Sequence, residues 1–257
     1  MVPRGNKNTT RRPYSGKRGF GKRSRKVSQN RAESAMQRAA AQLLAASGHC
    51  DNCEKPQALC TCALIKPIAP RTKLLILQHP QEPDKLLGSA RLTNLSVKES
   101  KLRVGLSWAN LDKAWDGQCE RNKWAVLYMG SSRLPQGVPS GFCGLFKVDK
   151  QNCGVWMEDS ELQLIEGIVL LDGTWSQAKT LWWRNPWLSK LKRVSVYSKA
   201  PSLYGELRKE PRKEGLSTLE AAACALSILE RDPSIFNSLT APFEQLLKLY
   251  RAAIQTA

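Results

Sequence analysis

The sequence has no long apolar run, few histidines and none of the common nucleotide-binding loops. Without an apolar run, no segment is typical of a membrane-spanning helix, and the basic first residues lack the apolar stretch of a secretory signal peptide. With only two histidines, a histidine-based catalytic triad is not expected. Neither a G-x-G-x-x-G after a strand nor a Walker loop is present, which argues against the commonest dinucleotide and triphosphate sites.

Acidic residues are scarce relative to basic ones. The 257 residues include 40 Lys and Arg against 22 Asp and Glu, which gives a net charge of +18. This charge favours a polyanionic partner, and we prefer nucleic acid to the competing interpretation, a membrane surface. Because no export signal is evident, we expect a cytoplasmic, reducing location without a disulfide framework. The scattered Cys119, Cys143, Cys153 and Cys224 are then ordinary thiols.

Residues 1–47 are interpreted as a basic arm followed by a short helix. The segment from Met1 to Asn30 has too few apolar residues to offset the entropy of ordering, so we predict that it is disordered. Its paired cations suit an arm that binds nucleic-acid phosphates without selecting a sequence; the alternative is a tail that only aids solubility. The Ala-rich stretch from Arg31 to Ser47 predicts a short helix.

Residues 48–66 carry a metal-binding pattern. Cys50, Cys53, Cys60 and Cys62 form C-x2-C, a gap of six residues and then C-x-C. Four thiolates so close together suit a closed tetrahedral zinc site, which would staple a segment too poor in apolar residues to fold alone. An iron–sulfur cluster uses the same ligands, and free thiols are the remaining alternative. We expect a structural zinc, because protein would fill all four positions.

Residues 67–257 alternate between strand and helix patterns. Strands are predicted at residues 73–78, 102–106, 124–129, 168–171 and 191–197, and helices at 85–95, after Thr174, at 217–230 and at 242–254. The segment from Gly130 to Glu161 is punctuated by Gly and Pro and is interpreted as an insertion or a long loop. The alternation predicts an α/β fold with a mainly parallel, doubly wound sheet.

The stretch from Gly167 to Trp187 organises the chain. Its apolar run ends at Asp172-Gly173, and Thr174 is the candidate N-cap of the helix that follows. An acid at the carboxyl end of a strand lies where ligands bind in open α/β sheets. Asp172 is therefore either a functional acid or only a residue that helps to cap the helix, and the spacing does not decide between the two.

Four tryptophans lie on or beside this helix: Trp175, Trp182, Trp183 and Trp187. Trp183 and Trp187 are four residues apart and are predicted to share one helix face, which is typical of core packing. Trp182 is predicted to point away from Trp183, so the two rings cannot both pack into the same core, and at least one must lie in other surroundings. In a protein this basic, those surroundings could be a nucleic-acid base.

Taken in order, the motifs resemble those of the DTW-domain family. Asp172-Gly173-Thr174-Trp175 stands in the place of the family's Asp-x-Thr-Trp motif, and the cysteine cluster lies upstream of it, as in family members. His79-Pro80-Gln81-Glu82 is similar to the family's His-Pro-x-Glu. Further similar segments are Gly88–Leu92, Leu127–Gly130, Pro201–Tyr204, Arg208–Pro211 and Leu216–Ala221. The basic arm and the segment from Gly130 to Glu161 depart from the family pattern.

The resemblance implies a SPOUT-like fold with helices on both faces of the sheet, of a kind that can be knotted in its C-terminal half. It also implies an enzyme, a tRNA-uridine aminocarboxypropyltransferase. Such an enzyme moves the 3-amino-3-carboxypropyl group of S-adenosylmethionine to N3 of a tRNA uridine and releases 5′-methylthioadenosine. The alternatives are a SPOUT-type RNA methyltransferase and a non-catalytic, zinc-bearing RNA-binding protein. No membrane and no obligate protein partner are expected.

We expect three sets of site residues in this domain. The catalytic set is Asp172, as general base or ligand-orienting acid, with Thr174 and Trp175. The set predicted to bind S-adenosylmethionine is Leu127, Tyr128, Gly130, Ser131, Leu170, Leu171, Leu216, Ser217 and Thr218. The RNA-binding set is Arg91, Arg208, Lys209 and Arg212. The first three could instead bind the carboxylate of the cofactor, and a solvated basic face is the remaining alternative.

Overall fold

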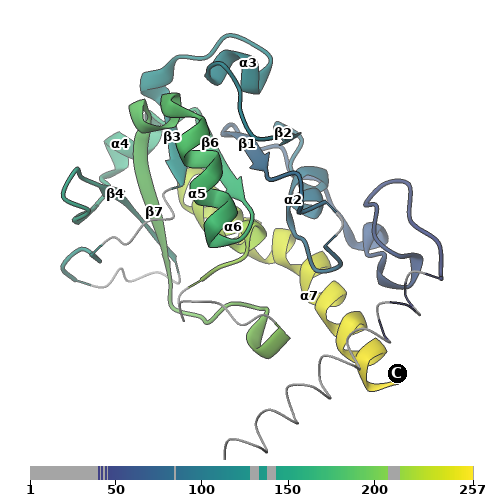
Figure 1. Cartoon of the computed structure of the whole chain (residues 1–257). Helices are drawn as coiled ribbons and strands as arrows, with labels where there is room; N and C mark the ends of the chain where they lie inside the picture. The colour runs from purple at the N-terminus through teal and green to yellow at the C-terminus, as the bar shows by residue number, and fades with distance from the viewer. Residues whose placement is uncertain are drawn as a thin grey trace, which may run out of the picture.

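Within the residues that the structure describes, a seven-stranded sheet forms the centre of the fold (Figure 1). The computed structural model describes residues 40, 42, 44, 46–83, 85–127, 133–137, 143–207 and 215–256. The strand order is β2-β1-β6-β3-β7-β4-β5. The strands are β1 (Lys73–Gln78), β2 (Ser100–Val104), β3 (Trp124–Leu127), β4 (Cys143–Val148), β5 (Gly154–Trp156), β6 (Gly167–Asp172) and β7 (Lys192–Ser198). The first five in this order are parallel, which confirms the predicted mainly parallel sheet.

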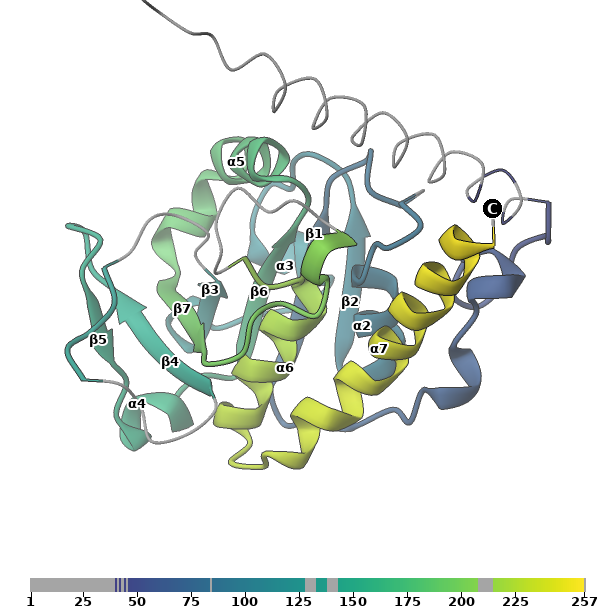
Figure 2. The same ribbon diagram turned by 90° about the horizontal axis from the view of Figure 1, so that it is seen from below.

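Helices cover both faces of the sheet, as Figure 2 shows. One face packs against α2 (Ala90–Ser96), α6 (Thr218–Leu229) and α7 (Ser234–Gln255), and the other against α3 (Leu111–Trp115) and α5 (Trp175–Arg184). The alternation within β1 explains the two layers: Leu74 and Ile76 enter the first core, while Leu75 and Leu77 enter the second. The α/β class and the two helical layers are therefore confirmed.

The central strand β6 has all six residues buried, as its apolar run predicts. Its first residue is a glycine for a packing reason. A Cβ on Gly167 would lie 2.5 Å from the ring of Trp124 on the neighbouring β3, so only glycine leaves room for that ring. Trp124 is itself 1% exposed. A small residue at the start of β6 thus lets a large one fill the core beside it.

The segment interpreted as an insertion or a long loop, Gly130 to Glu161, carries strands and a helix in its described residues, so it is not a loop without elements of its own. It contains β4, β5 and α4 (Asp159–Gln163), and β4 pairs antiparallel with β7. The glycines and prolines between these elements suggested a loop, but the short strands among them bury apolar residues such as Leu145 and Phe146. This antiparallel pair extends the parallel sheet on one side.

Three helix boundaries differ from prediction. The helix predicted at 85–95 begins only at Ala90, because the residues before Gly88 form turns against the segment around Lys55. The helix predicted from Pro242 begins at Ser234 and contains Pro242, because the earlier turns already bury apolar side chains. Helix α5 ends at Arg184, so Trp187 lies in the following 3-10 turn, η4 (Pro186–Lys190), and does not share a helix face with Trp183.

Two cysteines predicted to be ordinary thiols are paired. Cys143 on β4 and Cys224 on α6 form a disulfide that links the antiparallel edge of the sheet to a core helix. The two residues are 81 positions apart, and only the tertiary structure brings them together. Cys119 and Cys153 remain free thiols, as expected.

Some expectations fall outside the described residues. They include nearly all of the arm at 1–47, so its disorder and its short helix stay predictions. The C-terminal knot also stays a prediction, because segments 128–132, 138–142 and 208–214 are not among the described residues. Within the described part of the chain, no helix has the length and apolar character needed to cross a bilayer.

Candidate active site and metal centre

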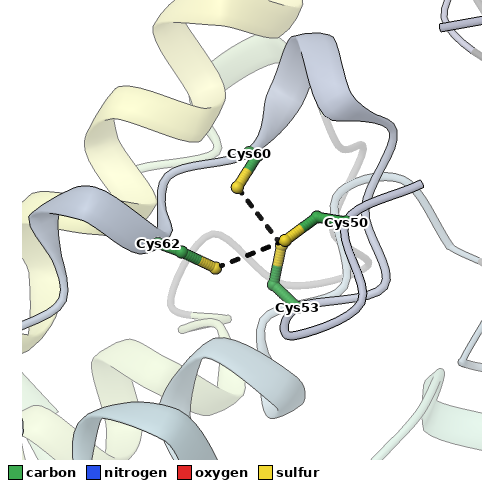
Figure 3. Close-up of side chains that lie close together, drawn as sticks. All are labelled: Cys50, Cys53, Cys60 and Cys62. Carbon is green, nitrogen blue, oxygen red and sulfur yellow. Dashed lines mark hydrogen bonds between the residues drawn. The ribbon is translucent and has the colours of Figure 1, made fainter. Parts of the chain in front are cut away.

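The four predicted metal ligands converge on one point (Figure 3). Cys50 and Cys53 lie in the turn before the 3-10 helix η1 (Gln57–Leu59). Cys60 directly follows η1, and Cys62 is the first residue of η2 (Cys62–Leu64). All four Sγ atoms lie within 4.8 Å of one another; Cys50 to Cys62 is 3.8 Å and Cys53 to Cys60 is 3.9 Å. Four sulfurs bound to one zinc at about 2.3 Å would be about 3.8 Å apart at tetrahedral corners.

The electrostatics of this centre suit a bound cation. Backbone N–H groups of Cys53 and Asn52 lower the pKa of the Cys50 thiol, which favours its thiolate. Burial raises the pKa of the Cys53 and Cys62 thiols, so a buried thiolate at either position needs a compensating positive charge. A metal ion would supply that charge, and the close sulfurs fit one ion better than a larger cluster.

The cysteine segment is built into the main core. Leu59, between the two cysteine pairs, is fully buried and belongs to the same core as β1 and β6. Arg91 on α2 fastens the segment from outside: its Nη2 lies 2.6 Å from Glu54 Oε1, and its Nε donates to the Asn52 carbonyl at 3.2 Å. The segment also contacts α7 through η1 and η2.

Asp172 lies at the carboxyl end of β6 and is buried, with 6% of its surface exposed. Both carboxylate oxygens accept hydrogen bonds. The Gln78 amide on β1 donates to Oδ2 at 2.9 Å, and the Thr218 hydroxyl on α6 donates to Oδ1 at 2.5 Å. A carboxylate has about four acceptor positions, so further ones remain for a ligand. Three segments distant in sequence thus fix the orientation of one acid.

The turn after Asp172 is held tightly. Gly173 has φ of +154°, and a Cβ there would lie 2.9 Å from the Gln177 Cβ, so glycine is needed. Thr174 caps α5, which confirms the predicted N-cap, and Gln177 completes a capping box with it. The Gln177 side chain also donates to Gln81 Oε1 at 3.2 Å, which ties this turn to the His79–Glu82 segment. Trp175 is half-buried at the first position of α5.

The start of α6 is a second organised terminus beside Asp172. Ser217 and Glu220 form the predicted capping box. Glu220 is 2% exposed and also accepts from the Leu203 N–H at 2.7 Å and the Ser202 hydroxyl at 2.9 Å. The segment after β7 is therefore fastened to the helix that donates to Asp172.

The residues predicted to bind S-adenosylmethionine differ in how far their side chains are available to a ligand. Leu127, Leu170 and Leu171 have buried side chains in the two cores, which leaves mainly their backbone groups for a ligand. Leu216 is half-buried, the Ser217 hydroxyl accepts from the Glu220 N–H, and the Thr218 hydroxyl is used by Asp172. Tyr128, Gly130 and Ser131 lie outside the described residues.

The predicted RNA-binding residues and the tryptophans are also only partly placed. The Arg91 guanidinium is partly exposed and contacts the exposed residues Glu54 and Asn52. Arg208, Lys209 and Arg212 lie outside the described residues. Of the tryptophans, Trp187 is buried, while Trp183 is 77% exposed.

Sequence reasoning missed Lys55 and Gln78. Lys55 lies between the two cysteine pairs and is 4% exposed; its Nζ donates to the Lys85 carbonyl at 2.6 Å. Burial lowers its pKa to about 8, against the opposing effect of nearby Cys53, Asp172 and two glutamates. A lysine in a short polar segment gave no signal of burial. Gln78 ends an apolar strand, and only the pairing of β1 with β6 shows that it faces Asp172.

The chain is similar to one protein family and to several named proteins. The model of the DTW domain family matches residues 47–251. A protein of Macaca fascicularis named tRNA-uridine aminocarboxypropyltransferase 2 is 30% identical over 202 residues, covering 77% of this chain and 61% of the relative. A Drosophila melanogaster protein of the same name is 31% identical over 203 residues, covering 77% and 73%. The chain thus spans about three fifths of the length of the first of these relatives. No solved structure matches the chain significantly.

Proposed function

This chain belongs to the DTW-domain family, and on that premise we propose that it is a tRNA-uridine aminocarboxypropyltransferase. It transfers the 3-amino-3-carboxypropyl group of S-adenosylmethionine to N3 of a uridine in tRNA. The names of its relatives support this reaction, and the net charge of +18 suits a polyanionic substrate. The observation that carries the proposal is Asp172: a buried carboxylate at a strand end, oriented by Gln78 and Thr218.

The reaction forms a nitrogen–carbon bond, breaks a carbon–sulfur bond and removes the proton from N3. Uridine N3 attacks the chain carbon attached to the sulfonium, the carbon–sulfur bond breaks, and its electron pair leaves with sulfur as neutral 5′-methylthioadenosine. The N3 proton must go to a base. Because the sulfonium activates all three attached carbons, the protein has to present the chain carbon and cover the methyl group. Much of the catalysis is therefore positioning.

Asp172 is the proposed base. Its two donors hold the carboxylate in one orientation, and its remaining acceptor positions can take the N3 proton. The alternative role is electrostatic, in which Asp172 stays ionised and holds a polar or charged group of the donor. Thr174 fixes the start of α5 beside it, and Trp175 is proposed to stack on the target base.

The donor would lie across the carboxyl ends of β3 and β6 and the start of α6. Backbone groups of Leu127, Leu170, Leu171 and Leu216 are proposed to read its polar atoms, together with Ser217 and Thr218. Tyr128, Gly130 and Ser131 are proposed to complete this set. Arg208, Lys209 and Arg212 are proposed to bind tRNA phosphates. Arg91 is proposed to join them, because its guanidinium is partly exposed although it pairs with Glu54.

We propose zinc as the ion of the four-cysteine centre, with Cys50, Cys53, Cys60 and Cys62 as ligands. The sulfur separations match a single tetrahedral ion. With all four positions filled by thiolates, the ion would serve structure. It would hold the segment that carries Lys55 against α2 and α7.

Mass spectrometry of nucleosides tests the proposal. Unmodified tRNA is incubated with the protein and S-adenosylmethionine, alongside Asp172→Asn. A uridine that gains an aminocarboxypropyl group, with far less product from the variant, is the expected result. A methylated nucleoside would instead support the methyltransferase. The non-catalytic RNA-binding alternative predicts no product and no rise in melting temperature with S-adenosylmethionine, whereas a ligand that binds the folded state raises it.

A further inference from the structure

A small pocket lies where the cysteine segment meets the carboxyl ends of β1 and β2. Its lining includes Lys55, Gln78, Glu82, Arg91 and Val104. Three of these polar side chains are more than nine-tenths buried: Lys55 and Gln78 are each 4% exposed, and Glu82 is 8% exposed. A pocket walled by buried groups of both charges is uncommon, because buried charges are costly unless something compensates for them.

The one hydrogen bond of Lys55 does not explain why an ammonium is buried in this pocket. The Lys55 ammonium donates to the Lys85 carbonyl, but an ammonium has three donors and a neutral side chain could make one such bond. Arg91, which is partly exposed, forms an ion pair with Glu54 at 2.6 Å. Lys55 and Glu82 place one buried cation and one buried anion in the lining of the same small pocket, an arrangement that matches a ligand carrying both charges.

The pocket shares a wall with the proposed active site. Gln78 lines the pocket and also donates to Asp172 Oδ2 at 2.9 Å. In the sheet, β2 and β1 lie on one side of β6, and β3 lies on the other. Adjacent strands are about 4.8 Å apart. The end of β1 at the pocket is therefore two strand spacings from the end of β3, and Asp172 at the end of β6 lies between them. A donor whose adenosine lies at β3 and β6 would extend its chain toward this pocket.

We propose that this pocket binds the zwitterionic end of the 3-amino-3-carboxypropyl group, with Lys55 pairing with its carboxylate and Glu82 with its ammonium. The inference rests on the proposed function and adds the site that recognises the transferred group. The same contacts can hold the group before and after transfer, because neither charged substituent takes part in the bond exchange. Only the carbon attached to sulfur has to reach uridine N3.

Two ligands isolate this contribution. S-Adenosylhomocysteine carries the aminocarboxypropyl group, whereas 5′-methylthioadenosine has a methyl group in its place. Their affinities are measured by isothermal titration calorimetry on the full chain for the wild type, Lys55→Met and Glu82→Gln. We expect the wild type to bind S-adenosylhomocysteine more tightly. Each variant should lose about ten- to a hundredfold of that affinity and keep its affinity for 5′-methylthioadenosine, since bonds to charged groups contribute on this scale.

Lys85→Met is the matched control, because it removes an exposed lysine whose backbone carbonyl alone takes part in the pocket. It should behave as the wild type does. Retained binding of 5′-methylthioadenosine shows that a variant is folded. If both variants weaken both ligands equally, or if the wild type binds the two ligands equally, the pocket does not read the amino-acid end and the inference is overturned, while use of the donor stands. If the wild type binds neither ligand, the proposed function falls and the inference with it.

Discussion

Replacing Asp172 by Asn separates the stability of the site from its chemistry. The two hydrogen bonds to the carboxylate are charge-assisted. An Asn side chain can keep both, with its oxygen toward Gln78 and its NH2 toward the Thr218 hydroxyl, which can turn to accept. Each bond then falls from about 1.5–3 to about 0.5–1.5 kcal/mol, so we expect a loss of about 2–3 kcal/mol in the free energy of unfolding. The variant should fold, and urea denaturation measures the loss.

The rate should fall much more than this local change suggests. Removal of a general base costs about 10²–10⁴-fold, equivalent to about 3–5 kcal/mol of the barrier. The assay is a single turnover of S-adenosylmethionine on tRNA, with the modified nucleoside quantified by mass spectrometry. If Asp172 takes the N3 proton, the rate of the variant should recover toward alkaline pH, where N3 ionises without help. A purely electrostatic role predicts a deficit that persists at every pH.

Thr218→Val is the control for this experiment. It removes the donor to Oδ1 and keeps the carboxylate and its bond to Gln78. At saturating S-adenosylmethionine most of the single-turnover rate should survive, with a small loss of stability, whereas the affinity for the donor should fall because Thr218 is also a proposed donor-binding residue. An Asp172→Asn enzyme that is folded and as fast as the wild type at neutral pH would refute the placement of the chemistry at this carboxylate.

Three other perturbations follow from the structure. Cys60→Ser removes one of four convergent sulfurs, so bound zinc, measured by elemental analysis of purified protein, should fall below one ion per chain together with the melting temperature. Gly167→Ala places a Cβ about where the Trp124 ring lies, and overpacking of this kind should cost about 1–3 kcal/mol in chemical denaturation. Glu220→Gln weakens acceptor bonds to the Leu203 N–H and its neighbours; we expect a loss of about 1–3 kcal/mol, and unchanged stability would contradict this interpretation.

Local chemistry made parts of the fold predictable from sequence. The apolar run before Asp172 is a strand because it is buried on both faces, and Thr174 and Ser217 cap helices because their side chains accept backbone N–H groups. The four cysteines were predictable as ligands because all of them lie in one short segment. In each case the residues that decide the structure are close together in the sequence.

Long-range pairing was not predictable in the same way. No local signal shows that β6 inserts between β1 and β3, or that β4 pairs antiparallel with β7. The partners of Asp172 follow from that pairing: Gln78 is 94 residues away and Thr218 is 46 residues away. The disulfide between Cys143 and Cys224 has the same origin. Sequence therefore located the acid, whereas the tertiary structure identified what holds it.

The strand order also determines when each edge of β1 can pair while the chain is being synthesised. β1 can pair with β2 as soon as residue 104 has emerged, but its other edge belongs to β6. Gln78 and Asp172 are 94 residues apart, so at roughly 5–20 residues per second the second edge waits about 5–20 seconds for its partner. During that interval the apolar strand from Leu74 to Leu77 has an open edge, which is prone to aggregation. The event that closes this edge also brings Gln78 to Asp172, so a chain released before residue 172 would carry the cysteine cluster and lack the proposed transfer site.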